Sequence, residues 1–183
     1  MPPKTRIGKE KILDAAFELT RERGAEAITA KAVVEKAGCS TQPVFWYYEN
    51  MDALKKEVFD RGLAFFGERL RAQRSDCESP YLGVGLNYIE FAAEEKGIFR
   101  MLFMSDFGGT DLVRADLEKD YILSIIEFSD GVTGAAAEDI YKEMWLFSHG
   151  IAAMTVTGTA KFSDAEIRRM LSRVYRGLLG SEI

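Results

Sequence analysis

Residues 28–54 constrain the fold of this chain more than any other stretch. Thr29 stands directly before apolar residues at helical spacing, so its hydroxyl can cap a first short helix. Gly38 supplies the left-handed backbone that ends this helix. Ser40 is the expected cap of a second, very short helix, and Asn50 is the expected cap of a third. Two short helices joined by a tight turn are typical of a helix-turn-helix.

The two short helices have faces of different character. Their apolar residues can all turn inward against neighbouring helices: Val33, Ala37, Val44 and Tyr48. The residues left facing outward are polar or aromatic: Lys31, Thr41, Gln42, Trp46 and Tyr47. Glutamine can pair with adenine in the major groove, threonine can meet a thymine methyl, and lysine and tyrosine bind phosphates. We interpret the second helix as one that enters a groove of DNA; the alternative is an ordinary helical hairpin whose aromatic residues form core.

A resemblance to a known family supports the first interpretation. It rests on five segments in a set order: Ile12–Gly24, Ile28–Thr29, Lys36–Ser40, Phe45–Tyr48 and Asn50–Leu54. Residues 7–60 thereby resemble the DNA-binding domain of the TetR/AcrR family of transcriptional regulators. The resemblance implies a recognition helix from about Ser40 to Tyr47 and phosphate contacts at Thr29 and at the start of the third helix. The predicted DNA-binding residues are Thr29, Lys31, Ser40, Thr41, Gln42, Pro43, Phe45, Trp46, Tyr47 and Asn50.

Two positions depart from the family pattern. The family usually has tyrosine where this chain has Phe45, so a hydroxyl that often reaches DNA is absent. It usually has lysine where this chain has Met51, so a phosphate-binding ammonium is absent too. Lys31, Trp46, Tyr47 and the N-terminal arm must then carry more of the contact, and we expect modest affinity for DNA. The alternative is a protein-interaction adaptor of the same fold that has weakened or lost DNA binding.

The net charge of −5 argues against a nucleic-acid partner only until its distribution is considered. Residues 1–60 hold ten basic and ten acidic side chains, so the excess of acid lies beyond residue 60. Within the first eleven residues, four basic side chains face only Glu10: Lys4, Arg6, Lys9 and Lys11. This arm can follow the DNA backbone or enter the minor groove, or it can be a solvated tail.

Composition narrows the class further. A chain of 183 residues has ample core for independent folding, and no apolar run approaches the length of a membrane span. No signal peptide is visible. Cys39 and Cys77 are far apart and lack metal-ligand spacing, which predicts a reducing, cytoplasmic location. We expect no metal, no cofactor and no membrane partner.

Beyond residue 50 the pattern is helical almost throughout. A long helix is expected over 50–74, and Ser163 with Glu166 gives a capping-box-like start to the last helix, which ends near Gly180. We predict an all-α fold of about nine helices, in which a three-helix head with the helix-turn-helix precedes a larger helical-bundle body. Residues 1–50 are the predicted DNA-binding domain, linked by a shared helix over 51–74. Residues 51–183 are the predicted effector-binding and dimerisation domain.

Three segments of the body extend the resemblance: Tyr88–Phe91, Ile98–Phe103 and Trp145–Gly150. They are similar to a class of TetR C-terminal domains named for its Trp-His-Gly (WHG) motif. In such proteins the body binds a small effector, and the last two helices pair with those of a second subunit. The resemblance therefore implies a homodimer formed through 137–157 and 163–180, where small and apolar residues allow close helix approach. The alternative is a buried helix in a monomer.

Aromatic and methionine residues gather in the body and suit an apolar or aromatic ligand. The candidate effector-binding residues are Phe91, Phe99, Phe103, Phe107, Tyr121, Trp145 and His149. Such residues are also typical of plain core. His149, the only histidine, is expected to form a hydrogen bond between helices more readily than to bind a ligand.

These observations favour a DNA-binding transcriptional regulator, a homodimeric repressor released from a pseudo-palindromic operator by a small apolar or aromatic effector. An enzyme is not expected, because the sequence has no Glu-x-x-His pair, no glycine-rich phosphate loop and no paired cysteines.

Overall fold

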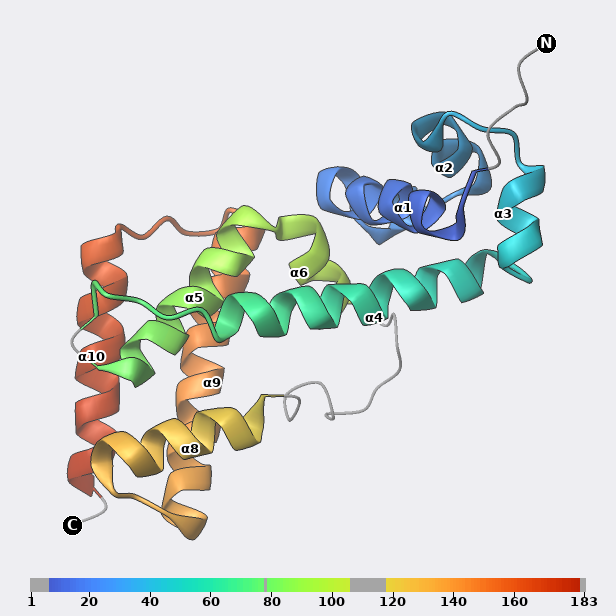
Figure 1. Ribbon diagram of the computed structural model, residues 1–183. Helices are drawn as coiled ribbons and strands as arrows, with labels where there is room; N and C mark the ends of the chain where they lie inside the picture. The colour runs from blue at the N-terminus through green and yellow to red at the C-terminus, as the bar shows by residue number, and fades with distance from the viewer. Residues whose placement is uncertain (1–6, 78, 106–117, 182–183) are drawn as a thin grey trace. The chain divides into compact units, whose positions relative to one another are not determined.

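The computed structural model describes residues 7–77, 79–105 and 118–181, and these residues are all-helical, as predicted (Figure 1). No helix among them is long and apolar enough to cross a membrane. The elements are α1 (Lys9–Arg23), a 3-10 turn (Ala25–Ala27), α2 (Ala30–Ala37), α3 (Gln42–Tyr47), α4 (Met51–Leu70), α5 (Pro80–Glu94), α6 (Lys96–Phe103), α8 (Lys119–Asp130), α9 (Gly134–Thr157) and α10 (Asp164–Ser181).

The chain forms two compact units. Unit 1 comprises Met1–Phe65 and Glu95–Thr110, and unit 2 comprises Phe66–Glu94 and Asp111–Ile183. The boundary therefore falls within α4 and again between α5 and α6. Unit 1 contains the helix-turn-helix of α2 and α3 together with α1, most of α4, and α6.

Unit 1 is built on α1, whose apolar side chains are buried against α2, α3 and α4. Fully buried residues come from each of these helices: Ile12, Ala16, Val33, Val44, Leu54 and Val58. The start of α6 packs on the end of α1, where the Arg21 guanidinium donates to both carboxylate oxygens of Glu95 at 2.7 and 2.5 Å. This pairing satisfies the buried Glu95 carboxylate, which is why a charged residue can lie beneath the surface.

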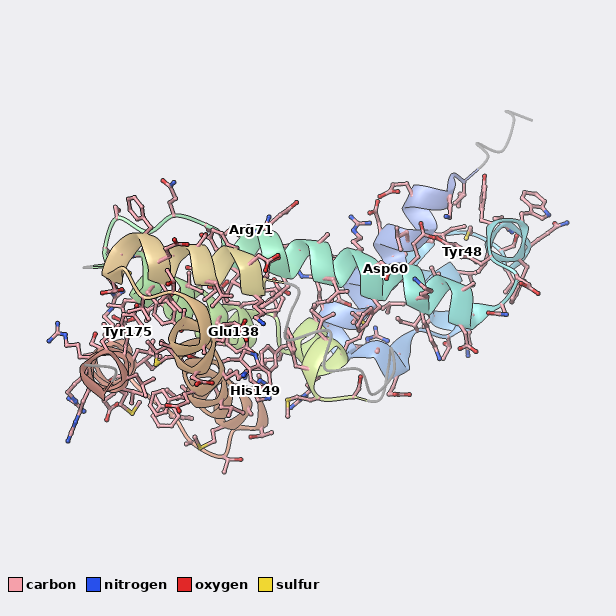
Figure 2. The ribbon with its side chains drawn as sticks, turned by 90° about the horizontal axis from the view of Figure 1, so that it is seen from below. Tyr48, Asp60, Arg71, Glu138, His149 and Tyr175 are labelled. Atoms are coloured by element: carbon pink, nitrogen blue, oxygen red, sulfur yellow. The ribbon has the colours of Figure 1, made fainter. Side chains whose placement is uncertain are left out.

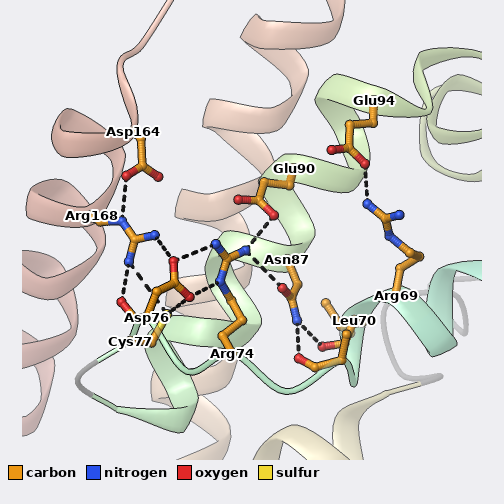
Figure 3. Close-up of polar contacts among 11 residues, drawn as sticks. Arg69, Leu70, Arg74, Asp76, Cys77, Asn87, Glu90, Glu94, Asp164 and Arg168 are labelled. Atoms are coloured by element: carbon orange, nitrogen blue, oxygen red, sulfur yellow. Dashed lines mark hydrogen bonds and ion pairs between the residues drawn. The ribbon is translucent and has the colours of Figure 1, made fainter.

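Unit 2 is centred on α5 and α9. The ring of Phe66, in the last part of α4, packs edge-on against Tyr88 and Phe91 of α5. The shared helix ends at Leu70, four residues before the predicted end. The Asn87 amide donates to the carbonyls of Leu70 and Ala72 at 3.0 and 2.8 Å, so α5 supplies the donor that a continuing helix would have supplied (Figure 3).

The start of the last helix agrees with the sequence. Ser163 and Glu166 form the predicted capping box, in which the Ser163 N–H donates to the Glu166 carboxylate at 2.8 Å and the Glu166 N–H donates to the Ser163 hydroxyl at 3.3 Å.

Candidate nucleic-acid interface

The turn between α2 and α3 has the predicted geometry. The Thr29 hydroxyl accepts from the Ala32 N–H at 3.2 Å and caps α2. Gly38 ends the helix in the left-handed conformation, with φ +69°, and the next N–H, that of Cys39, donates back to the Val34 carbonyl at 3.0 Å. The direction in which the chain enters α3 is therefore determined by local hydrogen bonds.

The expected cap of α3 is wrong. Thr41, not Ser40, is the residue that precedes the helix, and no side chain caps it. The backbone of Thr41 is already helical, and its carbonyl accepts from the Val44 N–H at 3.1 Å, so the first turn closes without a hydroxyl acceptor. Pro43 lies in that first turn, where it removes no helical hydrogen bond. Ser40 and Thr41 consequently present exposed hydroxyls that bond to no described residue.

The exposure of the side chains confirms that the polar and aromatic residues predicted to face outward on α3 do so; we call them the exposed row. Val44 is 0% exposed and Tyr48 is 4% exposed, so these two residues anchor the helix. On the other side Phe45, Trp46 and Tyr47 are exposed to 51%, 53% and 39%. Gln42 and Lys31 are exposed as well. Three exposed rings on a six-residue helix form an apolar surface of the kind that binds a partner.

The start of α4 resembles the start of α2. The Asn50 side-chain oxygen accepts from the Ala53 N–H at 2.9 Å and caps the helix, as predicted. Met51 is the first helical residue and is half-buried. Helix N-termini present backbone N–H groups and a positive dipole end to anions. Thr29 and Asn50 therefore mark two positions where phosphate oxygens can be held.

One contact that could not be predicted from the sequence joins the N-terminal segment to α3. The Tyr47 hydroxyl donates to the Ile7 carbonyl at 3.3 Å. Lys4 and Arg6 of the predicted basic arm lie outside the described residues. Lys9 pairs with Glu57 at 2.7 Å, which lowers the positive charge that this part of the arm offers to DNA.

Tyr48 combines burial with an unsatisfied polar group (Figure 2). Its hydroxyl forms no hydrogen bond with any residue that the structure describes. Burial, and then the neighbouring Glu57 carboxylate, raise the pKa of this phenol. The ring thus serves as an apolar anchor for α3 at the cost of a buried hydroxyl left unpaired.

The candidate effector-binding residues are divided between the two units. Tyr121, Trp145, His149 and the fully buried Phe91 belong to unit 2, whereas Phe99, also fully buried, and Phe103 belong to unit 1. Phe107 lies outside the described residues.

His149 forms the interhelical hydrogen bond that was its expected role. The Tyr88 hydroxyl of α5 lies 2.8 Å from His149 Nδ1 of α9, and the imidazole stacks on Trp145 with ring centroids 5.3 Å apart. Burial lowers the pKa of His149. The cavity beside Tyr88 and Trp145 measures about 40 Å³, which is close to the volume of one water molecule.

A larger pocket, of about 230 Å³, lies in unit 2 among Tyr81, Met144, Leu171 and Tyr175, and it shares Tyr81 and Met144 with the smaller cavity. Sequence reasoning missed it, because the whole segment 163–180, which includes Leu171 and Tyr175, is expected to form a dimer interface. The signal that could have indicated it is the pair of tyrosines, each on an otherwise apolar helix face.

The geometry of α2 and α3 defines a helix-turn-helix domain with an exposed second helix. Residues 12–58 match the family described as "Bacterial regulatory proteins, tetR family". Over this segment the chain is therefore similar to the N-terminal domain of that family.

Comparison with individual named proteins extends the likeness beyond this segment. The chain is 28% identical over 94 residues to "Uncharacterized HTH-type transcriptional regulator YvkB" of Bacillus subtilis (strain 168), covering 51% of this chain and 50% of that protein. It is 32% identical over 60 residues to the class D tetracycline repressor protein of Escherichia coli, covering 31% of this chain and 28% of that protein. The chain thus spans half or less of the length of these relatives.

A solved structure matches the fold over nearly the whole chain. It is described as the crystal structure of a TetR-like transcriptional regulator from Rhodococcus sp. RHA1, with a TM-score of 0.67 and 20% identity, covering 98% of this chain and 99% of that one. At this identity the likeness establishes the fold.

Proposed function

We propose that this chain is a cytoplasmic transcriptional regulator that binds double-stranded DNA as a homodimer and acts as a repressor. The observation that carries the proposal is the exposed row on α3. Val44 and Tyr48 hold the helix to unit 1, while Phe45 and Trp46 are each about half exposed. A monomer that had no partner for this helix would gain stability by burying those rings.

The residues of the row suit contact with a major groove. Gln42, at the start of α3, can donate to and accept from an adenine edge, and Thr41 can meet a thymine methyl. The starts of α2 and α4, marked by Thr29 and Asn50, can hold phosphates on either side of the groove, with Lys31 as a further phosphate ligand. In this proposal residues 1–50 form the DNA-binding domain, 51–74 the shared segment and 51–183 the effector-binding and dimerisation domain.

The homodimer is proposed to form through α9 and α10. Within the α9 segment expected to form that interface, Ile151 and Ala152 are buried within unit 2 itself. The exposed side chains on the neighbouring face of α9 are Leu146 at 62% and Met154 at 37%. Between them, a Cβ on Gly150 would meet no other atom within 4 Å, so the face leaves room for a second helix to approach closely.

The dimer would place two α3 helices against the two halves of a pseudo-palindromic operator, one helical turn or a multiple of it apart. A small apolar or aromatic effector would release the protein by fitting one spacing of the heads better than the other. Trp145, Tyr121 and His149 remain candidate contacts in unit 2. The cavity at Trp145, at about 40 Å³, must enlarge before it can hold such a molecule.

Phe45 and Met51 favour a second function, that of a helical adaptor that binds a protein through the same exposed row. Both positions lack the polar group that TetR-type recognition domains usually present to DNA. The exposed rings of Phe45 and Trp46 would then form the centre of a protein interface.

An electrophoretic mobility shift with the DNA that flanks the chain's own gene separates the two functions. The regulator is expected to shift this DNA in a salt-dependent manner and to lose binding when Lys31, Gln42 and Tyr47 are replaced together by alanine. The variant Gln73→Ala, at an exposed glutamine of unit 2, is the matched control and should bind normally. A folded protein that shifts neither this DNA nor genomic fragments at low salt would be an adaptor.

A further inference from the structure

The pocket of about 230 Å³ in unit 2 is walled by apolar and aromatic side chains of α5, α9 and α10. The rings of Tyr81 and Tyr175 are stacked there, with centroids 4.2 Å apart and planes 9° from parallel. The Tyr175 hydroxyl donates to Asp130, the last residue of α8, at 2.5 Å, which holds the ring in place. Leu171 of α10 lies opposite Gly85 of α5, where a Cβ would come within 3.1 Å of Leu171 Cδ1. The site is therefore pre-formed by packed residues.

A second cavity, of about 570 Å³, adjoins this pocket and shares Leu82, Ser172 and Arg176 with it. The arginines that line it all belong to α10: Arg168, Arg169, Arg173 and Arg176. We call this cavity the arginine groove.

The charge of the arginine groove is only partly compensated. Arg168 pairs with Asp164 and Asp76, and Asp76 also pairs with Arg74 (Figure 3). Arg169 and Arg173 form no ion pair with any described residue. The carboxylate that acts on Arg169, that of Glu166, is itself held by the Ser163 N–H and hydroxyl.

The carboxylates that line the pocket and the groove are those of Asp76 and Asp130. Both aspartates already accept hydrogen bonds from neighbours, Asp76 from Arg74 and Arg168, and Asp130 from Tyr175. Arg169 and Arg173 therefore leave positive charge in the groove, and the groove adjoins the pocket. Guanidinium groups bind planar oxyanions through paired hydrogen bonds.

We propose that unit 2 binds a small amphipathic anion at this site. A compact apolar or aromatic body would occupy the pocket beside Tyr81 and Leu171, and a carboxylate or phosphate would lie against Arg173. A pocket of about 230 Å³ is somewhat smaller than the roughly 300–1,000 Å³ that is usual for drug-sized ligands, so the body holds one or two rings. None of the aromatic residues predicted to bind an effector lines this pocket.

The pocket takes Leu171 and Tyr175 from the apolar α10 row that was expected at the dimer interface, and both are buried within unit 2. The remaining members of that row are Ile167, Val174 and Leu178. At about 100° per residue, the arginine row and the row of Ile167, Val174 and Leu178 lie on different flanks of the helix. A bound anion would join α10 to α5 and leave the apolar row uncovered. The inference that this anion acts as an effector rests on the proposed regulator function. The inference that unit 2 binds the anion does not rest on it.

Isothermal titration calorimetry in the absence of DNA tests the proposal with three probes of equal shape: 2-naphthoate, neutral 2-naphthamide and cationic 2-naphthylmethylammonium. We expect one 2-naphthoate per chain, with the amide and the cation each binding at least tenfold more weakly. Arg173→Glu should lower the affinity for 2-naphthoate about tenfold and remove the preference for the anion. Lys161→Glu, an equal charge change at an exposed lysine that lines neither cavity, should leave the affinity within twofold.

A second variant tests the location. Ser172→Phe fills the junction of pocket and groove and should abolish 2-naphthoate binding while circular dichroism stays unchanged. Equal binding of the three probes, no binding of 2-naphthoate at millimolar concentration, or full affinity in folded Arg173→Glu protein would each overturn the proposal. Because no DNA is present, such a result leaves the regulator function untouched, and failure of DNA binding leaves the anion site untouched.

Discussion

Gly97 lies so close to Thr20 that a Cβ added to it would be 1.9 Å from the Thr20 carbonyl oxygen and 2.9 Å from that of Arg21. The atoms it would meet belong to the backbone of α1, so no side-chain rotation can relieve the overlap. The contact is what allows the first turn of α6 to rest on the last turn of α1 inside unit 1.

Gly97→Ala should therefore force α6 away from α1 and lower the free energy of unfolding by about 1–3 kcal/mol or more, the cost typical of overpacking. Urea denaturation, monitored by circular dichroism, measures this change in the free energy of unfolding. Gly177→Ala is the matched control, because a Cβ at this helical glycine of α10 meets nothing within 4 Å. That variant should gain up to about 1 kcal/mol from helix propensity. Equal stability of the two variants would contradict the close approach.

His149 predicts a pH dependence of stability. Because burial lowers its pKa in the folded state, the unfolded chain binds the proton more readily. The contribution of neutral, buried His149 to the free energy of unfolding is present above the unfolded pKa of about 6.5. It is lost as pH falls through the lower pKa of the folded state. Protonation would also fix His149 Nδ1 as a donor in its 2.8 Å contact with the Tyr88 hydroxyl.

The free energy of unfolding should thus fall between pH 7.5 and pH 5.5, and His149→Gln should flatten that change. Since the chain has a single histidine, one substitution removes all imidazole titration. Denaturant titrations at several pH values make the measurement. A wild-type and variant protein with parallel pH profiles would show that His149 is not the titrating group.

What could be predicted from the sequence was local. Thr29, Gly38 and Asn50 act on backbone groups within about five residues of themselves, so the sequence alone indicates their caps. The cap of α3 was misplaced by one residue, because whether Thr41 is already helical depends on how α3 packs through Val44 and not on the neighbouring residue types.

What could not be predicted joins residues far apart in the chain. Arg21 and Glu95 are separated by 74 positions, and the Tyr175 hydroxyl and Asp130 by 45. No periodicity records such pairs, because helical spacing indicates which face is buried but not which helix covers it. The pocket at Tyr81 and Tyr175 arises from three helices meeting, so it became visible only in three dimensions.

Leu146→Glu should dissociate the proposed homodimer. The side chain is 62% exposed on α9, so the substitution costs the folded monomer little, whereas two glutamates would be desolvated and close together in a symmetric interface. Sedimentation velocity should show the wild type at twice the mass of the variant. The control is Phe128→Glu, since Phe128 of α8 is 88% exposed but lies outside the proposed interface. A variant that sediments like the wild type would exclude this face of α9 as the dimer contact.

Met51→Lys should strengthen DNA binding and make it more dependent on salt. Met51 is half-buried at the first position of α4, where an ammonium can add to the phosphate-binding capacity of the helix start. One added phosphate contact steepens the slope of log K against log salt by about 0.9. Fluorescence anisotropy over a salt series measures the slope. Lys56→Met, at an exposed lysine paired with Asp60 on the same helix, should leave it unchanged.

Gln42→Ala separates recognition of sequence from attachment to the backbone. Gln42 is exposed at the start of α3, and a bidentate contact to adenine would contribute about 1–3 kcal/mol of discrimination. The variant should lose that amount on its cognate operator and relax the preference at one base pair in each half-site. Binding to operators with each base pair substituted in turn gives the measurement, with Gln73→Ala as the control. An equal loss on every sequence would mean that Gln42 only positions the protein, and base discrimination would then have to come from the exposed hydroxyls and rings elsewhere in the row.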